Sequence, residues 1–199
     1  MKLIPVAEEF YSIQGEGYHT GKAAYFVRTG GCDLGCSWCD SPLSHNAAIH
    51  PLVSCDDIAQ RVLLSGADSV VVTGGEPLLY DMSYLTRLLK ERGLKTFLET
   101  SGTSSFTGTW DWICLSPKRG HHPSSMIYKM AHELKVVIET EDDFSWAEEC
   151  RAKAERDCML FLQPEWSRYS KVIPRIVDYV KKNSSWMISL QSHKFMRIP

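Results

Sequence analysis

The sequence lacks both a long hydrophobic run and an excess of charge of either sign. No apolar stretch approaches the ~18 residues that a membrane-spanning helix needs. The first residues, MKLIPV, lack the extended apolar segment of a signal peptide. Its 22 basic and 24 acidic residues give a formal net charge of -2, which provides no attraction to nucleic acid or to an anionic membrane surface. These absences predict a cytoplasmic protein that binds neither nucleic acid nor membrane.

Cysteine is too scarce for a disulfide scaffold. The 7 cysteines are an odd number, and in a reducing cytosol they are expected to be metal ligands or buried thiols. The 199 residues, of which 44% are hydrophobic, are enough to bury the core of one domain. We find no internal repeat, low-complexity tract or linker, and we therefore expect a single domain over residues 1–199.

Short runs rich in β-branched and aromatic residues alternate with longer helical patterns. The predicted strands are 24–27, 70–72, 96–98, 112–115, 135–138, 159–162 and 187–190. The predicted helices are 54–66, 81–93, 144–156 and 174–182; Ser54 is the expected N-cap of the first, and Gly66 its end. This alternation predicts an α/β fold with a parallel sheet. The pattern fits an incomplete barrel and an open sheet equally well.

Polar residues, glycine and proline follow five of the predicted strands. These segments are 73–77, 99–102, 116–118, 163–165 and 191–194. Parallel α/β proteins bind their ligands at the carboxyl ends of the strands. The five segments together therefore predict one shared site at that edge of the sheet.

The loop after the run 24–27 carries three cysteines, Cys32, Cys36 and Cys39, in the spacing CX3CX2C. Glycines at positions 30, 31 and 35 allow the loop to fold tightly enough for the thiols to converge. Buried structural cysteines rarely cluster in this way, so the loop predicts a metal site.

Two kinds of metal site fit three clustered thiols. Zinc needs a fourth ligand, which His45, His50 or Cys55 could supply, but structural zinc sites usually use CXXC pairs, and the loop holds only one. A 4Fe–4S cluster on three cysteines would leave one iron open to a small non-protein ligand. We favour the cluster.

The cysteine loop together with the later segment Gly74-Gly75-Glu76-Pro77 resembles the radical S-adenosylmethionine (SAM) superfamily. In that superfamily the amino and carboxyl groups of SAM bind the open iron. Four further segments are similar to the 7-carboxy-7-deazaguanine synthase family of radical SAM enzymes. They are 11–17 (YSIQGEG), 39–41 (CDS), 116–118 (SPK) and 191–194 (QSHK). The resemblance runs from residue 11 to the last residue and implies a partial, TIM-like barrel of parallel strands that forms a homodimer.

The resemblance also implies an activity. Members of the family are lyases that contract 6-carboxy-5,6,7,8-tetrahydropterin to 7-carboxy-7-deazaguanine with release of ammonia, on the route to queuosine and related deazapurines. They use a 4Fe–4S cluster, SAM and Mg²⁺, with a flavodoxin- or ferredoxin-type protein as the usual electron donor.

Residue roles follow from the same resemblance. Cys32, Cys36 and Cys39 would hold the cluster, and Ser41, where the family commonly has threonine, would bind magnesium. The residues implied to contact SAM are Trp38, Cys39, Asp40, Gly75, Glu76, Ser116, Pro117, Lys118, Gln163, Pro164, Glu165 and Trp166. Those implied to contact the pterin are Ile13, Gln14, Gly15, Glu16, Arg28, Thr73, His193 and Pro199, the last through its main-chain carboxylate. Arg28 has the bidentate guanidinium that suits a carboxylated substrate.

Two other functions are compatible with the cysteine loop. A glycyl-radical-enzyme activase shares CX3CX2C but acts on a protein, and the segment 14–17 and the terminal Pro199 argue against it. A non-enzymatic zinc-binding interaction module would use the same thiols, and metal analysis distinguishes it from both enzymes.

Overall fold

The computed structural model describes residues 2–199, and within them nine strands form one sheet in the order β3-β1-β2-β4-β5-β6-β7-β8-β9. The strands are β1 (Leu3–Ile13), β2 (Ala23–Thr29), β3 (Leu52–Ser54), β4 (Ser69–Gly74), β5 (Lys95–Thr100), β6 (Trp112–Leu115), β7 (Glu133–Ile138), β8 (Met159–Pro164) and β9 (Trp186–Ile188). Neighbours from β2 through β9 pair in parallel, whereas β1 is antiparallel to both β2 and β3. The sheet does not close, so the prediction of a partial α/β barrel is confirmed.

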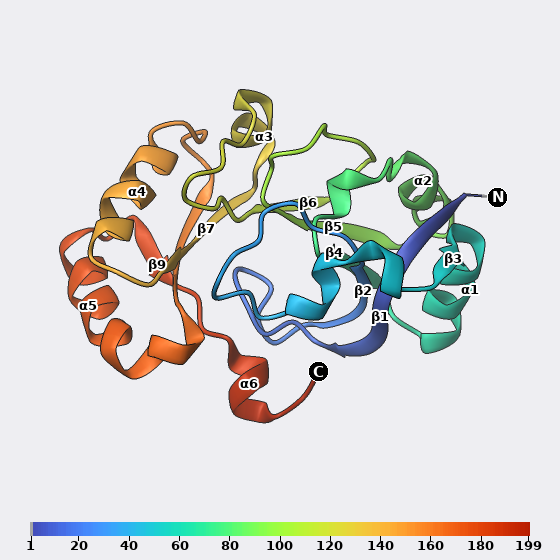
Figure 1. Cartoon of the computed structure of the whole chain (residues 1–199), viewed down its shortest axis with the longest axis horizontal. Coiled ribbons are helices and arrows are strands. Elements are labelled where there is room, and N and C mark those ends of the chain that lie inside the picture. The colour runs from blue at the N-terminus through green and yellow to red at the C-terminus, as the bar shows by residue number, and fades with distance from the viewer. Residues whose placement is uncertain (1) are drawn as a thin grey trace.

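The long α-helices follow the parallel strands and cover the outer face of the curved sheet (Figure 1). They are α1 (Cys55–Ser65), α2 (Ser83–Glu91), α4 (Asp142–Arg151) and α5 (Tyr169–Lys182), and two shorter helices are α3 (Ser125–Met130) and α6 (Ser192–Met196). In Figure 1, α1 and α2 lie at one end of the arc beside β1–β4, and α4 and α5 lie at the other end beside β7–β9. Helix α6 lies apart from them, next to the C-terminus.

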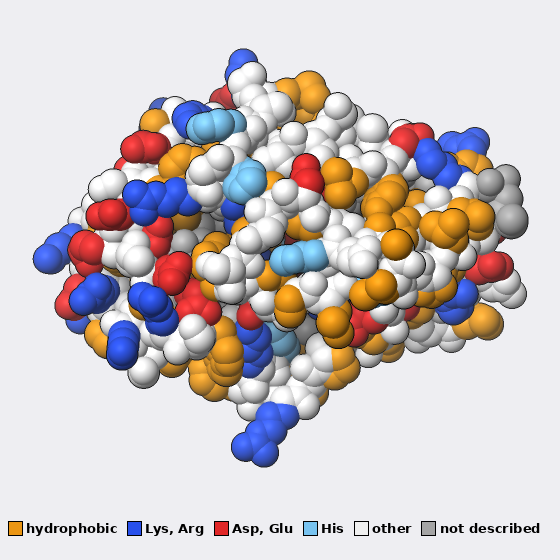
Figure 2. Space-filling model, viewed as in Figure 1, with side chains coloured by type: hydrophobic (Ala, Val, Ile, Leu, Met, Phe, Trp, Pro, Cys, Tyr) orange, Lys and Arg blue, Asp and Glu red, His pale blue; other side chains and the backbone are white. Residues whose placement is uncertain are grey.

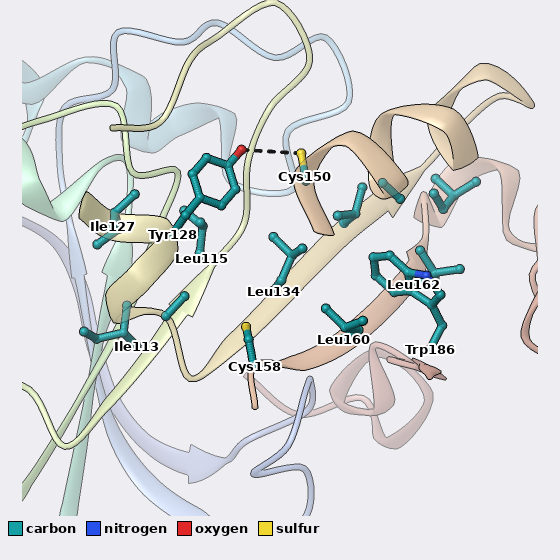
Figure 3. Packing of buried hydrophobic residues seen from close by; sticks show 14 of the residues in the cluster. Ile113, Leu115, Ile127, Tyr128, Leu134, Cys150, Cys158, Leu160, Leu162 and Trp186 are labelled. Carbon is teal, nitrogen blue, oxygen red and sulfur yellow. Dashed lines mark hydrogen bonds between the residues drawn. The ribbon is translucent and has the colours of Figure 1, made fainter. Parts of the chain in front are cut away.

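Two hydrophobic clusters attach the helices to the sheet. One joins α1 and α2 to the first strands through residues such as Ile58, Leu85 and Val72. The other packs α3, α4 and α5 against β5–β9, and Figure 3 shows Leu134, Leu160 and other members of this cluster. These contacts fix the spacing of the strands and therefore of the strand ends that carry polar residues.

Helix α1 follows the sequence prediction closely, and α5 does not. The Ser54 hydroxyl accepts a hydrogen bond from Asp56 N at 3.2 Å, and Gly66 ends α1 with a φ of 75°. Helix α5 begins at Tyr169, before the predicted start at 174, and so contains Pro174. Because a proline has no N–H, the helix gives up one backbone hydrogen bond at this position.

The sequence prediction missed the longest strand, β1, and the two short helices α3 and α6. Strand β1 contains Glu8 and Glu9 and a register shift between Val6 and Glu8. This irregularity obscures the alternation of polar and apolar residues by which a strand is recognised.

The loop between β1 and β2 crosses the open side of the partial barrel. Its Gly17 N–H donates to Ser189 Oγ, which follows β9, at 2.9 Å. Its Tyr18 N–H donates to the Glu133 carboxylate of β7 at 3.0 Å, and its Gly15 carbonyl accepts from Ser192 N at 2.9 Å. The loop therefore connects the two ends of the sheet and forms the wall that further strands would form in a closed barrel.

The surface carries charges of both signs in close mixture. On the face shown in Figure 2, basic and acidic side chains lie side by side over α4 and α5. Over residues 2–199, none of the helices combines the length and the apolarity that crossing a bilayer requires.

Candidate active site

A cavity of about 290 Å³ lies at the carboxyl ends of the parallel strands. Five of these strands contribute polar residues to its wall: Arg28, Thr73, Glu99, Lys135 and Gln163. The predicted site residues that line it are Ile13, Gln14, Gly15, Glu16, Arg28, Cys32, Cys36, Trp38, Cys39, Asp40, Ser41, Thr73, Gly75, Glu76, Ser116, Lys118, Gln163, His193 and Pro199. Residues from both ends of the sequence thus meet in one site.

Four residues predicted to contact SAM lie outside this wall: Pro117, Pro164, Glu165 and Trp166. The Glu165 carboxylate instead caps a short 3-10 helix, accepting from Ser167 N at 2.9 Å and Arg168 N at 3.0 Å. The Trp166 ring packs against Tyr169 and Phe195.

The three cysteines of the loop face the cavity together. Cys32, Cys36 and Cys39 are partly exposed, whereas the other four cysteines of the chain are buried: Cys55, Cys114, Cys150 and Cys158. Burial raises the pKa of the Cys32 and Cys36 thiols, which favours the protonated form when no positive charge is near. An iron centre would supply that charge and deprotonate a coordinating thiol.

The arrangement of the thiols differs from that of a preformed zinc site. Within the described part of the chain, no three His, Cys, Asp or Glu side chains are grouped closely enough to hold a single metal ion. The cysteine ligands of a 4Fe–4S cluster bind different iron atoms and so lie farther apart than the ligands of one ion. Three thiols that line one cavity in this way fit the cluster better than zinc.

The cysteine loop packs closely on the glycine segment after β4. A Cβ atom added to Gly75 would lie 2.0 Å from the Gly31 carbonyl oxygen. The Glu76 N–H donates to the same carbonyl at 2.8 Å. Glycine at position 75 is therefore required for the two segments to lie side by side.

Glu76 joins the ends of β4 and β5. Its carboxylate is 1% exposed and accepts from Thr100 Oγ1 at 2.6 Å, Ser101 N at 2.8 Å and Ser101 Oγ at 2.5 Å. It also accepts from Leu78 N at 3.0 Å. Four donors hold this carboxylate at the cavity wall, as a buried charge requires.

Lys118 brings a cation to the cysteine side of the cavity. Its ammonium donates to the carbonyl and hydroxyl oxygens of Ser116, both at 2.7 Å, and lies 5.6 Å from the centre of the Trp38 ring. Burial lowers the pKa of Lys118, while the nearby Cys36 opposes that shift.

Glu99, which the sequence analysis did not select as a site residue, lies on the opposite wall. Its carboxylate accepts from Gln14 Nε2 and from Thr73 Oγ1, each at 2.9 Å. Glu99 follows a predicted strand and comes two residues after Phe97, so the two side chains lie on the same face of the sheet. This position could have identified Glu99 as a site residue.

Lys135 is a second residue that the prediction missed. It lies in β7, is 4% exposed and forms an ion pair with Glu16. Burial alone would raise the pKa of Glu16, but the charge of Lys135 and hydrogen bonds from Lys135 and Gln191 lower it to about 2. Lys135 lies inside a β-branched run, where a charged side chain is buried only when it is paired. This pattern could have identified Lys135 as a site residue.

Gln191 connects the two sides of the cavity. Its amide nitrogen donates to Glu16 Oε1 at 2.9 Å and to Asp40 Oδ2 at 2.7 Å. Lys194, one turn later, donates to Asp40 Oδ1 at 2.5 Å. These bonds tie the C-terminal segment to the cysteine loop and to the loop after β1.

Three more predicted residues are held at the rim. Arg28 donates from Nε to Glu8 Oε1 at 2.6 Å. His193 packs so closely on Gly15 that a Cβ atom there would lie 2.1 Å from His193 Nδ1. The Pro199 oxygen accepts from Ser12 Oγ at 2.9 Å.

Comparison with known proteins agrees with this geometry. A family model described as "Radical SAM superfamily" matches residues 26–115, the segment that contains the cysteine loop and Gly75. A partial parallel barrel with three cysteines at the carboxyl end of β2 defines the class of radical SAM enzymes.

Individual relatives identify the family within this class. The chain is 52% identical to the 7-carboxy-7-deazaguanine synthase of Flavobacterium psychrophilum over 198 residues, covering 100% of this chain and 94% of the relative. It is 42% identical to the enzyme of the same name from Synechocystis, covering 98% and 93%. The crystal structure of QueE from Escherichia coli superposes with a TM-score of 0.82 at 30% identity, covering 94% of this chain and 93% of that one. The chain belongs to the 7-carboxy-7-deazaguanine synthase family.

Proposed function

We propose that this protein contracts 6-carboxy-5,6,7,8-tetrahydropterin to 7-carboxy-7-deazaguanine, with release of ammonia. The observation that carries the proposal is that one cavity joins the three cysteine thiols to a wall of charged and amide side chains from the strand ends. The names of the relatives identify the substrate class, and the polar wall has the functional groups that such a substrate requires.

Cys32, Cys36 and Cys39 would hold the 4Fe–4S cluster. With SAM bound, the reduced cluster would supply reductive cleavage of SAM and thereby abstraction of a hydrogen atom from the substrate. The protein would hold the reacting groups in contact, because the strand ends and the loops that follow them line one cavity.

The SAM side of the cavity would be formed by residues near the cysteine loop. Trp38, Asp40, Gly75, Glu76, Ser116, Lys118 and Gln163 line the cavity and are placed for direct contact. Pro117, Pro164, Glu165 and Trp166 would act indirectly, by holding the segments at the ends of β6 and β8 in position.

The pterin side would be formed by the remaining wall. The Nε atom of Arg28 is held by Glu8, which leaves the terminal nitrogens of the guanidinium to bind the substrate carboxylate. Gln14, Thr73 and Glu99 form one hydrogen-bonded group that can bind the donors and acceptors of the aminopyrimidinone edge. Ile13, Gly15, Glu16, His193 and Pro199 complete this wall.

Ser41 would bind Mg²⁺ together with the carboxylate of the substrate. It lines the cavity directly after the last loop cysteine, and within the described chain its hydroxyl does not cap the following 3-10 helix. A hard cation that keeps several waters needs only a few protein oxygen ligands. A homodimer and a flavodoxin- or ferredoxin-type electron donor belong to the same proposal.

Anaerobic turnover by two matched cysteine variants tests this function. We expect Cys36→Ala to abolish conversion of the carboxypterin, because the cluster loses a ligand. Cys158→Ala removes a buried thiol away from the cavity and should retain activity. Stoichiometric zinc in colourless protein would indicate the interaction module, and SAM cleavage without a purine product would indicate an activase.

A further inference from the structure

His45 carries a buried ring nitrogen with no hydrogen-bond partner. Among residues 2–199, the buried side-chain nitrogens in this state belong to His19, His45 and Trp146. Of these three residues, His45 lines the cavity of the cysteine loop, and its unpaired atom is Nε2. A buried polar atom without a partner destabilises the folded protein, so the atom is expected to bind something that occupies the cavity.

A second histidine in the same loop shows that the loop can satisfy an imidazole internally. His50 Nε2 lies 2.9 Å from the Leu43 carbonyl oxygen. His45 Nε2, in the same loop, has no such partner and lies at the cavity wall.

The backbone holds residue 45 next to a cluster ligand. The Cys32 N–H donates to the His45 carbonyl at 3.1 Å, and the Gly31 N–H donates to the Ser44 carbonyl at 2.6 Å. The Ser44 hydroxyl donates to the Ser41 carbonyl at 2.6 Å. The segment that carries His45 is thus fixed at both ends of the cysteine loop.

We propose that His45 Nε2–H donates a hydrogen bond to a sulfur atom of the 4Fe–4S cluster and raises the reduction potential of the cluster. Reduction adds one electron to the cluster, and the N–H group stabilises the added negative charge on sulfur. No bond in the protein breaks, and His45 keeps its proton. The inference rests on the proposed function, because it requires the cluster.

The test compares the cluster of the reconstituted full-length protein with that of three variants, first without SAM and then with SAM added. His45→Leu removes the donor, His45→Gln keeps an N–H donor, and His50→Gln is the matched control in the same loop. Iron and sulfide content establish that each protein is loaded. EPR-monitored titration then gives the midpoint potential, and resonance Raman spectra in H₂O and D₂O detect a proton bonded to sulfur.

We expect His45→Leu to make reduction about tenfold less favourable, a shift of ~59 mV to lower potential for a one-electron couple. It should also lose the deuterium shift of the iron–sulfur bands. His45→Gln should recover most of both signals, and His50→Gln should match the wild type.

Equal potentials and equal deuterium shifts in loaded wild-type and His45→Leu protein would overturn the inference about His45 and leave the proposed function standing. A difference that arises only when SAM is added would also overturn it, because SAM would then be the acceptor. A wild-type protein that fails to assemble any cluster would overturn the proposed function itself.

Discussion

At the scale of single residues, the carboxylate of Glu99 joins two neighbouring side chains of the cavity wall. It accepts one hydrogen bond from Gln14 and one from Thr73, and it therefore fixes both side chains. A carboxylate accepts only, so its replacement by an amide of the same size puts an N–H₂ group where a lone pair is needed.

We predict that Glu99→Gln lowers kcat/KM for the carboxypterin by roughly 10- to 100-fold, mainly through KM. Hydrogen bonds to a charged group contribute about 1.5–3 kcal/mol, and 1.4 kcal/mol corresponds to a tenfold change. Steady-state kinetics measure the effect, with the exposed Glu91→Gln as control. An unchanged KM in protein with a normal cluster spectrum would contradict this role.

The polar residues at the ends of the strands could be predicted because they directly follow apolar runs in the sequence. Thr73, Ser116 and Gln163 follow apolar runs, and the structure places all three in the cavity wall. Glu99 lay in the predicted segment 99–102 without an assigned role, and Lys135 was not predicted. Pairing decides whether a charged side chain points inward, and their partners Gln14 and Glu16 are far away in sequence.

At the scale of elements, the loop between β1 and β2 determines how the barrel is completed. His19, in this loop, stacks on Phe97 with ring centres 4.5 Å apart, and both of its ring nitrogens are buried without a partner in the described chain. Burial, with repulsion from Lys22 and Lys95, lowers the pKa of His19 from 6.5 to about 4.

Because of His19 in this loop, the free energy of unfolding should decrease as the pH falls. Below pH 6.5 the unfolded chain binds a proton at His19, whereas the folded chain binds it only near pH 4. The stability contributed by neutral His19 is therefore present above pH 6.5 and lost between pH 6.5 and about 4.

We predict that His19→Phe raises the free energy of unfolding by about 1 kcal/mol at neutral pH, because the two unpaired nitrogens are removed. The advantage over the wild type should grow as the pH falls to 5. Urea unfolding at pH 7.5 and pH 5 measures both effects. An equal difference at the two pH values would show that His19 does not titrate in this way.

The strands and helices differ in how far the sequence could predict them. The pattern of apolar runs predicted β2 and β4–β9, most directly where a strand is buried on both faces of the parallel sheet, as β2 and β4 are. Strand β1 was missed because it contains Glu8 and Glu9 and because a register shift interrupts its alternation. The crossing of the open side by the loop after β1 depends on contacts with Glu133 and Ser189, which no local pattern shows.

At the scale of the whole molecule, the ends of the chain meet the cysteine loop at one cavity. Gln191 bonds to Glu16 and Asp40 at once, so the first strand, the cluster loop and the C-terminal helix form one connected wall. Residues from both ends of the sequence therefore share the wall of one cavity.

The central claim is that this cavity carries out the loss of ammonia that accompanies ring contraction. The most direct measurement is anaerobic incubation of the reconstituted, reduced protein with SAM, Mg²⁺ and 6-carboxy-5,6,7,8-tetrahydropterin, followed by quantification of both products. We expect ammonia and 7-carboxy-7-deazaguanine in equal amounts, increasing together with time. Cleavage of SAM with neither product formed, in protein that holds an intact cluster, would contradict it.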